Sequence, residues 1–149
     1  MKLFTPDARK NRVTEIDAEL LRALGVKGVI VDLDNTLGGY DDPLPPDDVI
    51  AWAAGIKDAG FALYIVSNNS HKQRVSAYAE ALGVPWKHMS AKPLTFKLRR
   101  AAREMGLKRR EICSVGDKVR TDLIGGRLAG MKTLLVTSVA KLKQRGELR

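Results

Sequence analysis

The chain has 149 residues, of which 44% are hydrophobic, so it carries enough apolar surface for a folded core and is not an intrinsically disordered chain. Its formal net charge is +9, which suits an anionic partner such as nucleic acid, a phosphorylated substrate or an anionic lipid. A single cysteine, Cys113, excludes an internal disulfide. Its place in the apolar stretch 112–115 predicts a buried strand residue.

The apolar runs are all too short for a membrane span, and the polar, basic residues 1–13 contain no apolar segment typical of a secretory signal. We therefore expect a cytoplasmic protein, or one that binds peripherally to a membrane. At this length we expect one domain over residues 1–149. Whether the chain forms an oligomer is left open by the sequence.

In chain order, the apolar pattern predicts alternating helices and strands between two basic ends. Residues 1–13 are expected to form a loose basic arm and residues 140–149 a basic tail. Thr14 is expected to cap a helix that runs to Leu24 and stops at Gly25. The expected strands are 28–33, 61–66, 86–89, 111–115 and 132–136. The expected later helices are 47–59, 71–82, 94–105 and 121–129.

Strands that alternate with single helices predict an α/β fold with a central parallel sheet of about five strands. The strands are nearly continuous apolar runs, which is typical of a sheet covered by helices on both faces. Ligands of such sheets bind beyond the carboxyl ends of the strands. The polar residues that follow the strands are therefore the candidate site residues.

Four groups of polar residues follow the predicted strands, and parallel packing would bring them to one edge of the sheet. They are Asp32 and Asp34, the triplet Ser67, Asn68 and Asn69, the triplet Ala91-Lys92-Pro93, and Asp117 with Asp122. Carboxylates gathered in this way have raised pKa values unless a cation lies among them, and oxygen-rich sites of this kind favour Mg²⁺. The Lys92 ammonium and the Ser67 hydroxyl are suited to bind phosphate. One carboxylate can attack phosphorus while a second moves the proton.

The segments DLDNTL, SNN, AKP and GDKVRTD, in this order, resemble the four motifs of the haloacid dehalogenase (HAD) superfamily of phosphatases. The resemblance implies a three-layer α/β/α Rossmann-like fold, with Asp32 as the nucleophile that forms an aspartyl-phosphate and Asp34 as the general acid and base. It also implies the remaining roles: phosphate binding by Ser67, Asn68 and Lys92; Mg²⁺ binding by Asp32, Asp117 and the backbone carbonyl of Asp34; and secondary roles for Asp122 (through a water or behind the metal ligands), Thr36 and Lys118.

The finer pattern, including the lead-in VKGVIVDLDNT, is similar to the small subclass IIIA proteins of the bacterial YqeG type. The mitochondrial phosphatidylglycerophosphate phosphatases are similar to this group. The two places where this superfamily inserts a cap domain are short here, 37–60 and 70–92, so we expect no cap. An open crevice fits a bulky phosphate ester, such as phosphatidylglycerophosphate, a phosphoprotein or a nucleic-acid end.

The sequence therefore predicts a capless, Mg²⁺-dependent phosphomonoesterase. The alternative is a binding protein that keeps the fold and docks on RNA, for instance on the ribosome, through its basic surface. A receiver domain also uses aspartate, hydroxyl and lysine, but its phosphorylated aspartate normally ends the third strand. Weaker candidates for substrate contact are His71, Lys72 and Arg74, which open the helix after SNN, and Arg120, which lies beside Lys118.

Overall fold

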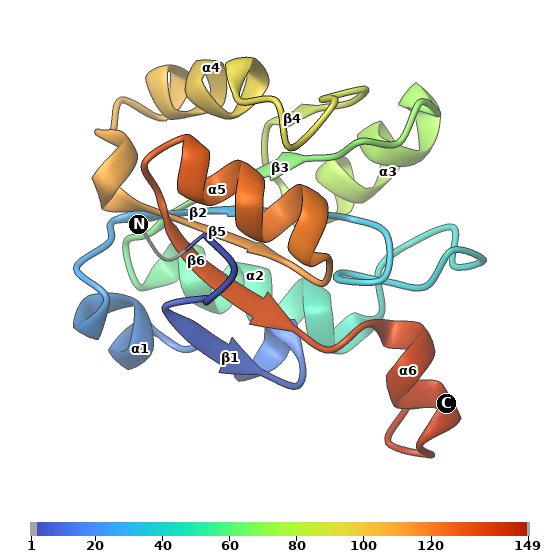
Figure 1. Cartoon of the computed structure of the whole chain (residues 1–149). Coiled ribbons are helices and arrows are strands. Elements are labelled where there is room, and N and C mark those ends of the chain that lie inside the picture. Colours follow the sequence, from blue (N-terminus) through green and yellow to red (C-terminus); the bar gives the residue numbers. More distant parts are fainter. Residues whose placement is uncertain (1–2, 149) are drawn as a thin grey trace.

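The computed structural model describes residues 3–148 and contains a six-stranded sheet between two layers of helices (Figure 1). Residues 1 and 2 of the predicted arm and residue 149 of the predicted tail lie outside the described residues. The strand order is β1-β6-β5-β2-β3-β4, and every neighbouring pair is parallel. The expected parallel α/β fold is confirmed, with one strand more than the five expected.

The elements agree closely with the predicted ranges in the middle of the chain. The strands are β1 (Ala8–Lys10), β2 (Gly28–Val31), β3 (Ala62–Val66), β4 (Trp86–Lys87), β5 (Ile112–Gly116) and β6 (Lys132–Val136). The α-helices are α1 (Ala18–Ala23), α2 (Asp47–Asp58), α3 (Lys72–Leu82), α4 (Phe96–Met105), α5 (Ile124–Leu128) and α6 (Val139–Gln144). The short helical turns are η1 (Val13–Glu15), η2 (Arg109–Glu111) and the π-helical turn η3 (Val119–Leu123) that leads into α5.

The N-terminal segment is not the loose basic arm that we expected. Residues 8–10 form β1, which adds a sixth strand beside β6. Asp7 fixes this strand, because its carboxylate accepts a hydrogen bond from the Thr133 backbone N–H at 2.9 Å and pairs with Arg127 at 2.9 Å. The tertiary partner, and not local propensity, makes this three-residue strand.

The first predicted helix and the basic tail also differ from expectation. The helix expected from Thr14 to Leu24 is divided into η1 and α1, because the Asp17 side chain caps α1 by accepting a hydrogen bond from the Leu20 N–H at 2.8 Å. The expected basic tail, 140–149, is helical in its first part, because α6 runs from Val139 to Gln144 and is capped by Ser138.

The strands bury both of their faces, which explains their continuous apolar runs. Val29 and Val31 of β2 belong to a core under α1, α2 and α3, whereas Ile30 belongs to a second core under α4 and α5. The alternation follows from the strand geometry, in which successive side chains point to opposite faces. Cys113 lies in the first core and is buried, as predicted.

The connections leave the carboxyl edge of the sheet without a cap. Between β2 and β3 the chain forms a loop and α2, and between β3 and β4 it forms α3 alone. The expected absence of a cap domain is thus confirmed for residues 3–148. Of the helices that the structure describes, none has the length and apolar character needed to cross a bilayer.

Candidate active site

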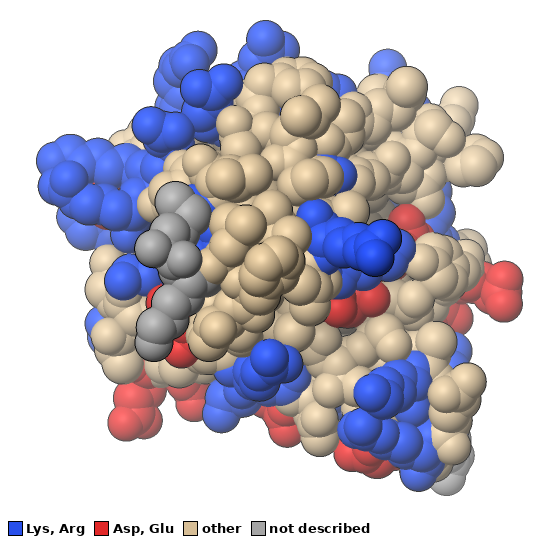
Figure 2. Space-filling model, viewed as in Figure 1, with Lys and Arg blue, Asp and Glu red and all other residues tan. Residues whose placement is uncertain are grey.

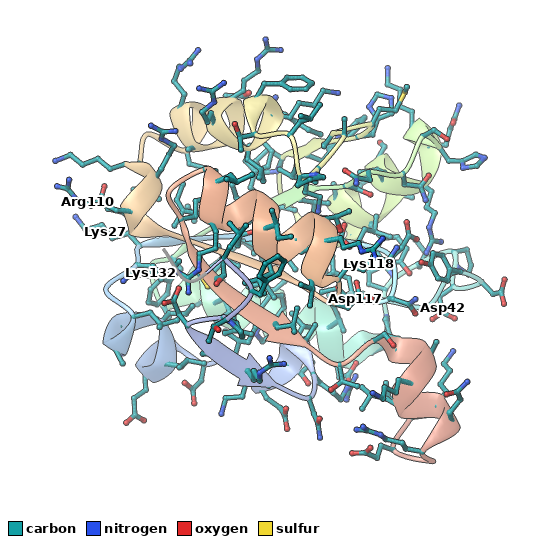
Figure 3. The ribbon with its side chains drawn as sticks, in the orientation of Figure 1. Lys27, Asp42, Arg110, Asp117, Lys118 and Lys132 are labelled. Carbon is teal, nitrogen blue, oxygen red and sulfur yellow. The ribbon has the colours of Figure 1, made fainter. Side chains whose placement is uncertain are left out.

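The carboxyl ends of β2, β3 and β5 bring the predicted polar groups to one edge of the sheet. A crevice of about 360 Å³ lies there. Its lining includes Asp32, Asp34, Ser67, Asn68, Lys92 and Lys118, together with Tyr40, Asn69, Ser70 and Thr121. Asp117 follows β5 at the same edge, where Figure 3 labels it beside Lys118. The four sequence motifs therefore meet in space as expected.

Lys92 lies at the centre of an acidic cluster. Its Nζ, on a side chain that is almost wholly buried, donates to Asp122 Oδ1 at 2.6 Å and to Asp32 Oδ1 at 3.2 Å. One carboxylate oxygen from each of Asp32, Asp117 and Asp122 lies within 4.8 Å of the other two. Within residues 3–148, Lys92 is the one cation that forms an ion pair with this cluster, and it pairs with two of the three carboxylates, so the cluster carries excess negative charge.

The acidic cluster changes the titration of its members. Burial, followed by the Asp122 carboxylate, raises the pKa of Asp32 to about 7 although Lys92 opposes the change. Burial and Asp122 likewise raise the pKa of Asp117 to about 6. A divalent cation among these oxygens would stabilise the ionised forms, and an all-oxygen donor set with excess negative charge fits Mg²⁺.

Asp122, which we expected to act through a water or behind the metal ligands, lies in one cluster with Asp32 and Asp117. The turn η3 holds its carboxylate, where Oδ2 accepts a hydrogen bond from the Lys118 backbone N–H at 3.1 Å. Gly116 is required here, because a Cβ on that residue would overlap the Asp122 carboxylate. Thr36 donates to Asp117 Oδ1 at 3.3 Å and so links the first motif to the last.

The side chain of Asn68 contacts Lys92 instead of extending into open space toward a phosphate. Its amide nitrogen donates to the Lys92 carbonyl at 3.0 Å, and its amide oxygen accepts from the Lys92 N–H at 2.8 Å. These two bonds fix the main chain from which Lys92 projects, so a phosphate contact of Asn68 would come from its backbone N–H. The buried Ser67 Oγ accepts from the Asn69 N–H at 3.0 Å, which leaves its hydroxyl proton available for a ligand.

The side chains of Arg74 and Asn69 hold the Asp34 carboxylate. The sequence did not predict these two contacts. Arg74 Nε and Nη2 both lie 2.9 Å from Asp34 Oδ1. Asn69 Nδ2 donates to the other oxygen, Oδ2, at 2.8 Å. The sequence makes Arg74 a candidate for substrate contact and does not predict its contact with Asp34. The feature that could have indicated this contact is the place of Arg74 in the first turn of the helix after SNN.

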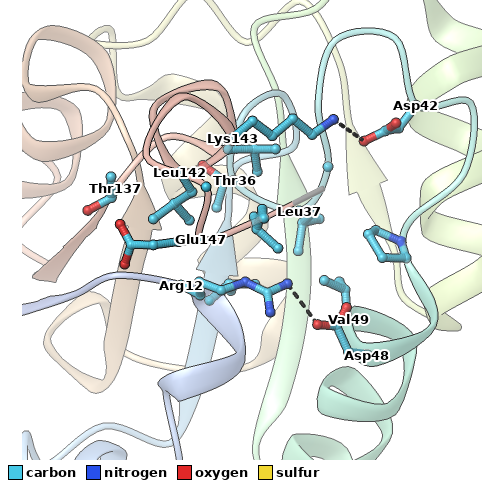
Figure 4. A pocket seen from close by; sticks show the side chains of 16 residues that line it. Arg12, Thr36, Leu37, Asp42, Asp48, Val49, Thr137, Leu142, Lys143 and Glu147 are labelled. Atoms are coloured by element: carbon cyan, nitrogen blue, oxygen red, sulfur yellow. Dashed lines mark ion pairs between the residues drawn. The ribbon is translucent and has the colours of Figure 1, made fainter.

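Lys118 lies at the rim of the crevice, where its Nζ is 3.2 Å from the Tyr40 hydroxyl. A separate pocket of about 450 Å³ lies behind the loop that follows Asp34, between that loop, α2 and α6 (Figure 4). Ion pairs join Arg12 to Asp48 at 2.7 Å and Lys143 to Asp42 at 3.9 Å across it. The acids of the cluster do not line this pocket, so the chemistry belongs to the crevice.

A parallel sheet with a buried lysine and clustered aspartates beyond its strand ends is the arrangement of HAD-type hydrolases. A family model described as HAD-hydrolase-like matches residues 90–146. The chain is 39% identical over 139 residues to a Bacillus subtilis (strain 168) protein named "Probable phosphatase YqeG", covering 93% of this chain and 80% of that one. The chain belongs to the HAD superfamily of hydrolases, in its YqeG-type phosphatase group.

Other similarities are shorter or concern the fold alone. Two chloroplastic phosphoglycolate phosphatases of Arabidopsis thaliana, 1A and 1B, are 45% identical over 47 residues, which is 32% of this chain and 13% of each of theirs. A solved structure of an uncharacterized protein from Listeria monocytogenes serotype 4b has a TM-score of 0.62 at 14% identity, covering 82% of this chain and 97% of that one. A hypothetical protein from Xanthomonas campestris has a TM-score of 0.57 at 15% identity, covering 94% and 80%.

Proposed function

We propose that the protein is a Mg²⁺-dependent phosphomonoesterase that acts through an aspartyl-phosphate on Asp32. The observation that carries the proposal is the cluster of Asp32, Asp117 and Asp122 at the open edge of the sheet, in which the buried Lys92 contacts Asp32 and Asp122. A purely structural cluster would be neutral or evenly paired, because buried like charges are costly. A site for an anionic substrate and a cation accounts for the imbalance.

Each residue has a role that its position supports. Asp32 attacks phosphorus in line and displaces the alcohol, and Asp34 gives the leaving oxygen a proton. Asp34 then takes a proton from the water that hydrolyses the aspartyl-phosphate. The Lys92 ammonium balances charge on the transferring phosphoryl group, and the Ser67 hydroxyl donates a hydrogen bond that orients it.

Mg²⁺ fits the oxygen donors of Asp32, Asp117 and the Asp34 backbone carbonyl, with Asp122 beside them. When bound, the cation supplies charge neutralisation and a fixed position for the phosphate oxygens. Asn68 and Thr36 act on neighbours, since the first holds the Lys92 main chain and the second holds Asp117. Lys118, at the rim, is placed to attract an anionic substrate.

The proposed substrate is a bulky phosphate ester, and phosphatidylglycerophosphate is the first candidate. Large apolar side chains are exposed in segments that border the crevice: Tyr40 lines it, and Met89, Leu94 and Phe96 flank Lys92 along the chain. Exposed apolar residues in one region are typical of a surface that meets an apolar partner. A lipid with an anionic headgroup would satisfy both this surface and the cationic rim.

Hydrolysis of p-nitrophenyl phosphate tests the proposal. We expect turnover that requires Mg²⁺, stops with EDTA and falls about a thousandfold or more in Asp32→Asn. The matched control is Asp58→Asn, which makes the same change on the exposed side of α2. Wild-type turnover in Asp32→Asn, or full activity in EDTA, would show that the proposed nucleophile or the metal requirement is wrong.

A comparison of natural esters tests the substrate. Phosphatidylglycerophosphate in mixed micelles, phosphoglycolate and a phosphopeptide should be supplied under the same conditions. We expect the highest kcat/KM for the lipid. A higher kcat/KM for phosphoglycolate, the substrate in the name of the Arabidopsis relatives, would show that the lipid is the wrong substrate and that a small phosphorylated acid is the better candidate.

A further inference from the structure

A dense group of cations extends along α4 to the end of the sheet that lies away from the crevice. Seven of the fourteen residues from Lys97 to Arg110 are lysine or arginine, and one is acidic. Lysine and arginine side chains gather over α4 and the turn that follows it, at the upper left of Figure 2. Figure 3 shows Arg110 at this end, well apart from Lys118 at the crevice.

Five of these cations line one groove of about 740 Å³. They are Arg99, Arg103, Lys108, Arg109 and Arg110. The floor and the far wall come from Ala102, Leu107, Leu128, Ala129 and Gly130. The described residues that line this basic groove include no acidic and no aromatic side chain.

The local fold explains how the cations meet. Arg99 and Arg103 are four residues apart in α4 and share one face of the helix. Gly106 ends α4 with a left-handed φ of 70°, which turns the chain back so that residues 108–110 pass beside the helix end. Two cationic segments are thereby joined into one surface.

The five cations exceed what the protein itself needs at this position. Within residues 3–148, none of them has a carboxylate within ion-pair distance, and all five are exposed. The carboxyl ends of α4 and α5 lie here and each carries about half a negative charge. Two helix ends therefore balance roughly one of the five positive charges.

The basic groove is separate from the proposed phosphatase site. It lies at the amino ends of β5 and β6, where the turn η2 enters β5 and α5 leads to β6. The crevice lies at the carboxyl ends of β2, β3 and β5. A ligand in the groove cannot contact Asp32, so the groove needs its own anionic partner.

We propose that the basic groove binds the phosphodiester backbone of a double-stranded nucleic acid, in addition to the proposed phosphatase activity at the other edge. Four of the five cations are arginine, whose planar guanidinium can hold two phosphate oxygens at once. The lack of aromatic side chains in the lining excludes the stacking of bases that single-strand binding uses. Contacts limited to phosphates make the binding independent of sequence.

A membrane surface fits the groove less well. The groove is concave, and Leu128 is the one large apolar side chain in its lining that the structure describes as exposed. Of the other exposed large apolar residues, Tyr40 lines the crevice, and Met89, Leu94 and Phe96 flank Lys92 along the chain. Since the two regions lie at opposite edges of the sheet, one membrane cannot contact both.

Fluorescence anisotropy with labelled 20-base-pair RNA and DNA duplexes tests the proposal. If all five cations contact phosphates, the slope of log K against log salt is about −4.5, so affinity falls about 500-fold between roughly 50 and 200 mM salt. The test variant is Arg99→Gln/Arg103→Gln/Arg109→Gln/Arg110→Gln. It should weaken binding at least tenfold and lower the slope by about 0.9 for each cation removed. The RNA and DNA arms show which duplex the groove prefers.

The matched control removes the same charge from surfaces outside the groove: Arg9→Gln/Lys10→Gln/Arg22→Gln/Lys141→Gln. It should retain most of the duplex affinity. An equal loss of duplex affinity in both variants would overturn the proposal and indicate a net-charge effect. Absence of duplex binding by the wild-type protein at 50 mM salt would overturn it as well. A third outcome would also overturn the proposal: the wild-type protein binds phosphatidylglycerol vesicles but no duplex, and the groove variant loses the vesicle binding. That result would assign the groove to a membrane surface.

Hydrolysis of p-nitrophenyl phosphate separates this proposal from the proposed function. The groove variant should keep wild-type turnover, because none of its four residues lies at the crevice. A groove variant that keeps its turnover but loses its duplex affinity supports duplex binding at a groove separate from the phosphatase site. A groove variant that loses turnover and keeps its folded circular dichroism spectrum would overturn the separation of the two sites.

Discussion

At the residue scale, the feature with the strongest consequence for mechanism is the fixation of Asp34. Both of its carboxylate oxygens are occupied, one by Arg74 and one by Asn69. Arg74 also donates to the carbonyls of Gly39 and Asp42 and lies over the Tyr78 ring, so the guanidinium is itself fixed. The proton transfer that we propose for Asp34 needs this kind of orientation, because small displacements reduce the rate sharply.

We predict that Arg74→Gln lowers kcat about tenfold or more with little change in KM, because Asp34 loses its orientation but remains present. Arg74→Lys should recover part of the loss, since one donor is restored without the fork of the guanidinium. Steady-state kinetics across pH measure both effects. An increase in KM at unchanged kcat would indicate that Arg74 binds substrate instead of positioning Asp34.

The acidic cluster predicts a pH dependence of stability without metal. The pKa of Asp32 is about 7 in the folded protein and about 3.9 in an unfolded chain, so the folded state binds more protons between these values. The free energy of unfolding contributed by Asp32 therefore decreases as pH rises from about 4 to 7. Asp117, with a pKa of about 6, acts in the same direction.

We expect the melting temperature of metal-free protein to fall between pH 5 and 8, and to fall less in Asp32→Asn. Millimolar Mg²⁺ should raise the melting temperature more at pH 8 than at pH 5, because the ligands must be ionised. Calorimetry with and without EDTA measures this. A Mg²⁺ effect that is equal at both pH values, or unchanged in Asp32→Asn, would contradict cation binding by the cluster.

At the scale of elements, α6 supports the loop that follows β2, which carries the proposed catalytic residues Asp32 and Asp34. The first two backbone N–H groups of α6, at Val139 and Ala140, donate to the carbonyl of Asn35 at 2.9 Å and to its Oδ1 at 3.2 Å. Free N–H groups at a helix start need such acceptors. Asn35 lies between Asp34 and Thr36 and has a φ of 63°, a conformation that asparagine tolerates better than most residues.

We predict that Asn35→Ala lowers the free energy of unfolding by about 2 kcal/mol, from left-handed strain and one lost hydrogen bond. Asn35→Gly should lose about 1 kcal/mol, because glycine accepts the positive φ and only the hydrogen bond is lost. Urea unfolding measures the difference. Equal losses in both variants would show that the backbone conformation contributes nothing.

At the scale of the whole molecule, segments near both ends of the chain pack against its central part. β1 and β6 complete the sheet on one side, and α6 contacts the loop that follows β2. Trp52 lies in the core under α2, where its Nε1 donates to the Ile16 carbonyl at 2.8 Å, while Trp86 lies in the edge strand β4. The two fluorescent residues thus lie in different elements, α2 and β4, and both pack against the first core.

We predict that residues 1–149 unfold as one domain in a single urea transition. Tryptophan fluorescence of Trp52→Phe and Trp86→Phe should give the same midpoint as far-ultraviolet circular dichroism of each variant. The m value should lie at about 1–3 kcal/mol/M. Separate midpoints in one variant would show that part of the chain folds independently.

The sequence by itself determined the order of strands and helices from β2 to β6 and the polar residues that follow the strands. Local patterns carry that information, since burial on both faces requires apolar runs and a parallel sheet places strand ends at one edge. Asp32, Lys92 and Asp117 could therefore be placed together before the structure was known. The resemblance of their motifs to the HAD superfamily was equally readable from the chain.

The tertiary structure alone decided what those residues contact. Arg74 lies forty residues from Asp34, and Asn68 contacts Lys92 twenty-four residues away, so no local pattern connects them. β1 exists because β6 supplies its hydrogen bonds, and residues 1–13 have no apolar run of their own. The basic groove likewise forms where the end of α4 meets the turn between α5 and β6, because a surface is a property of packing and not of sequence order.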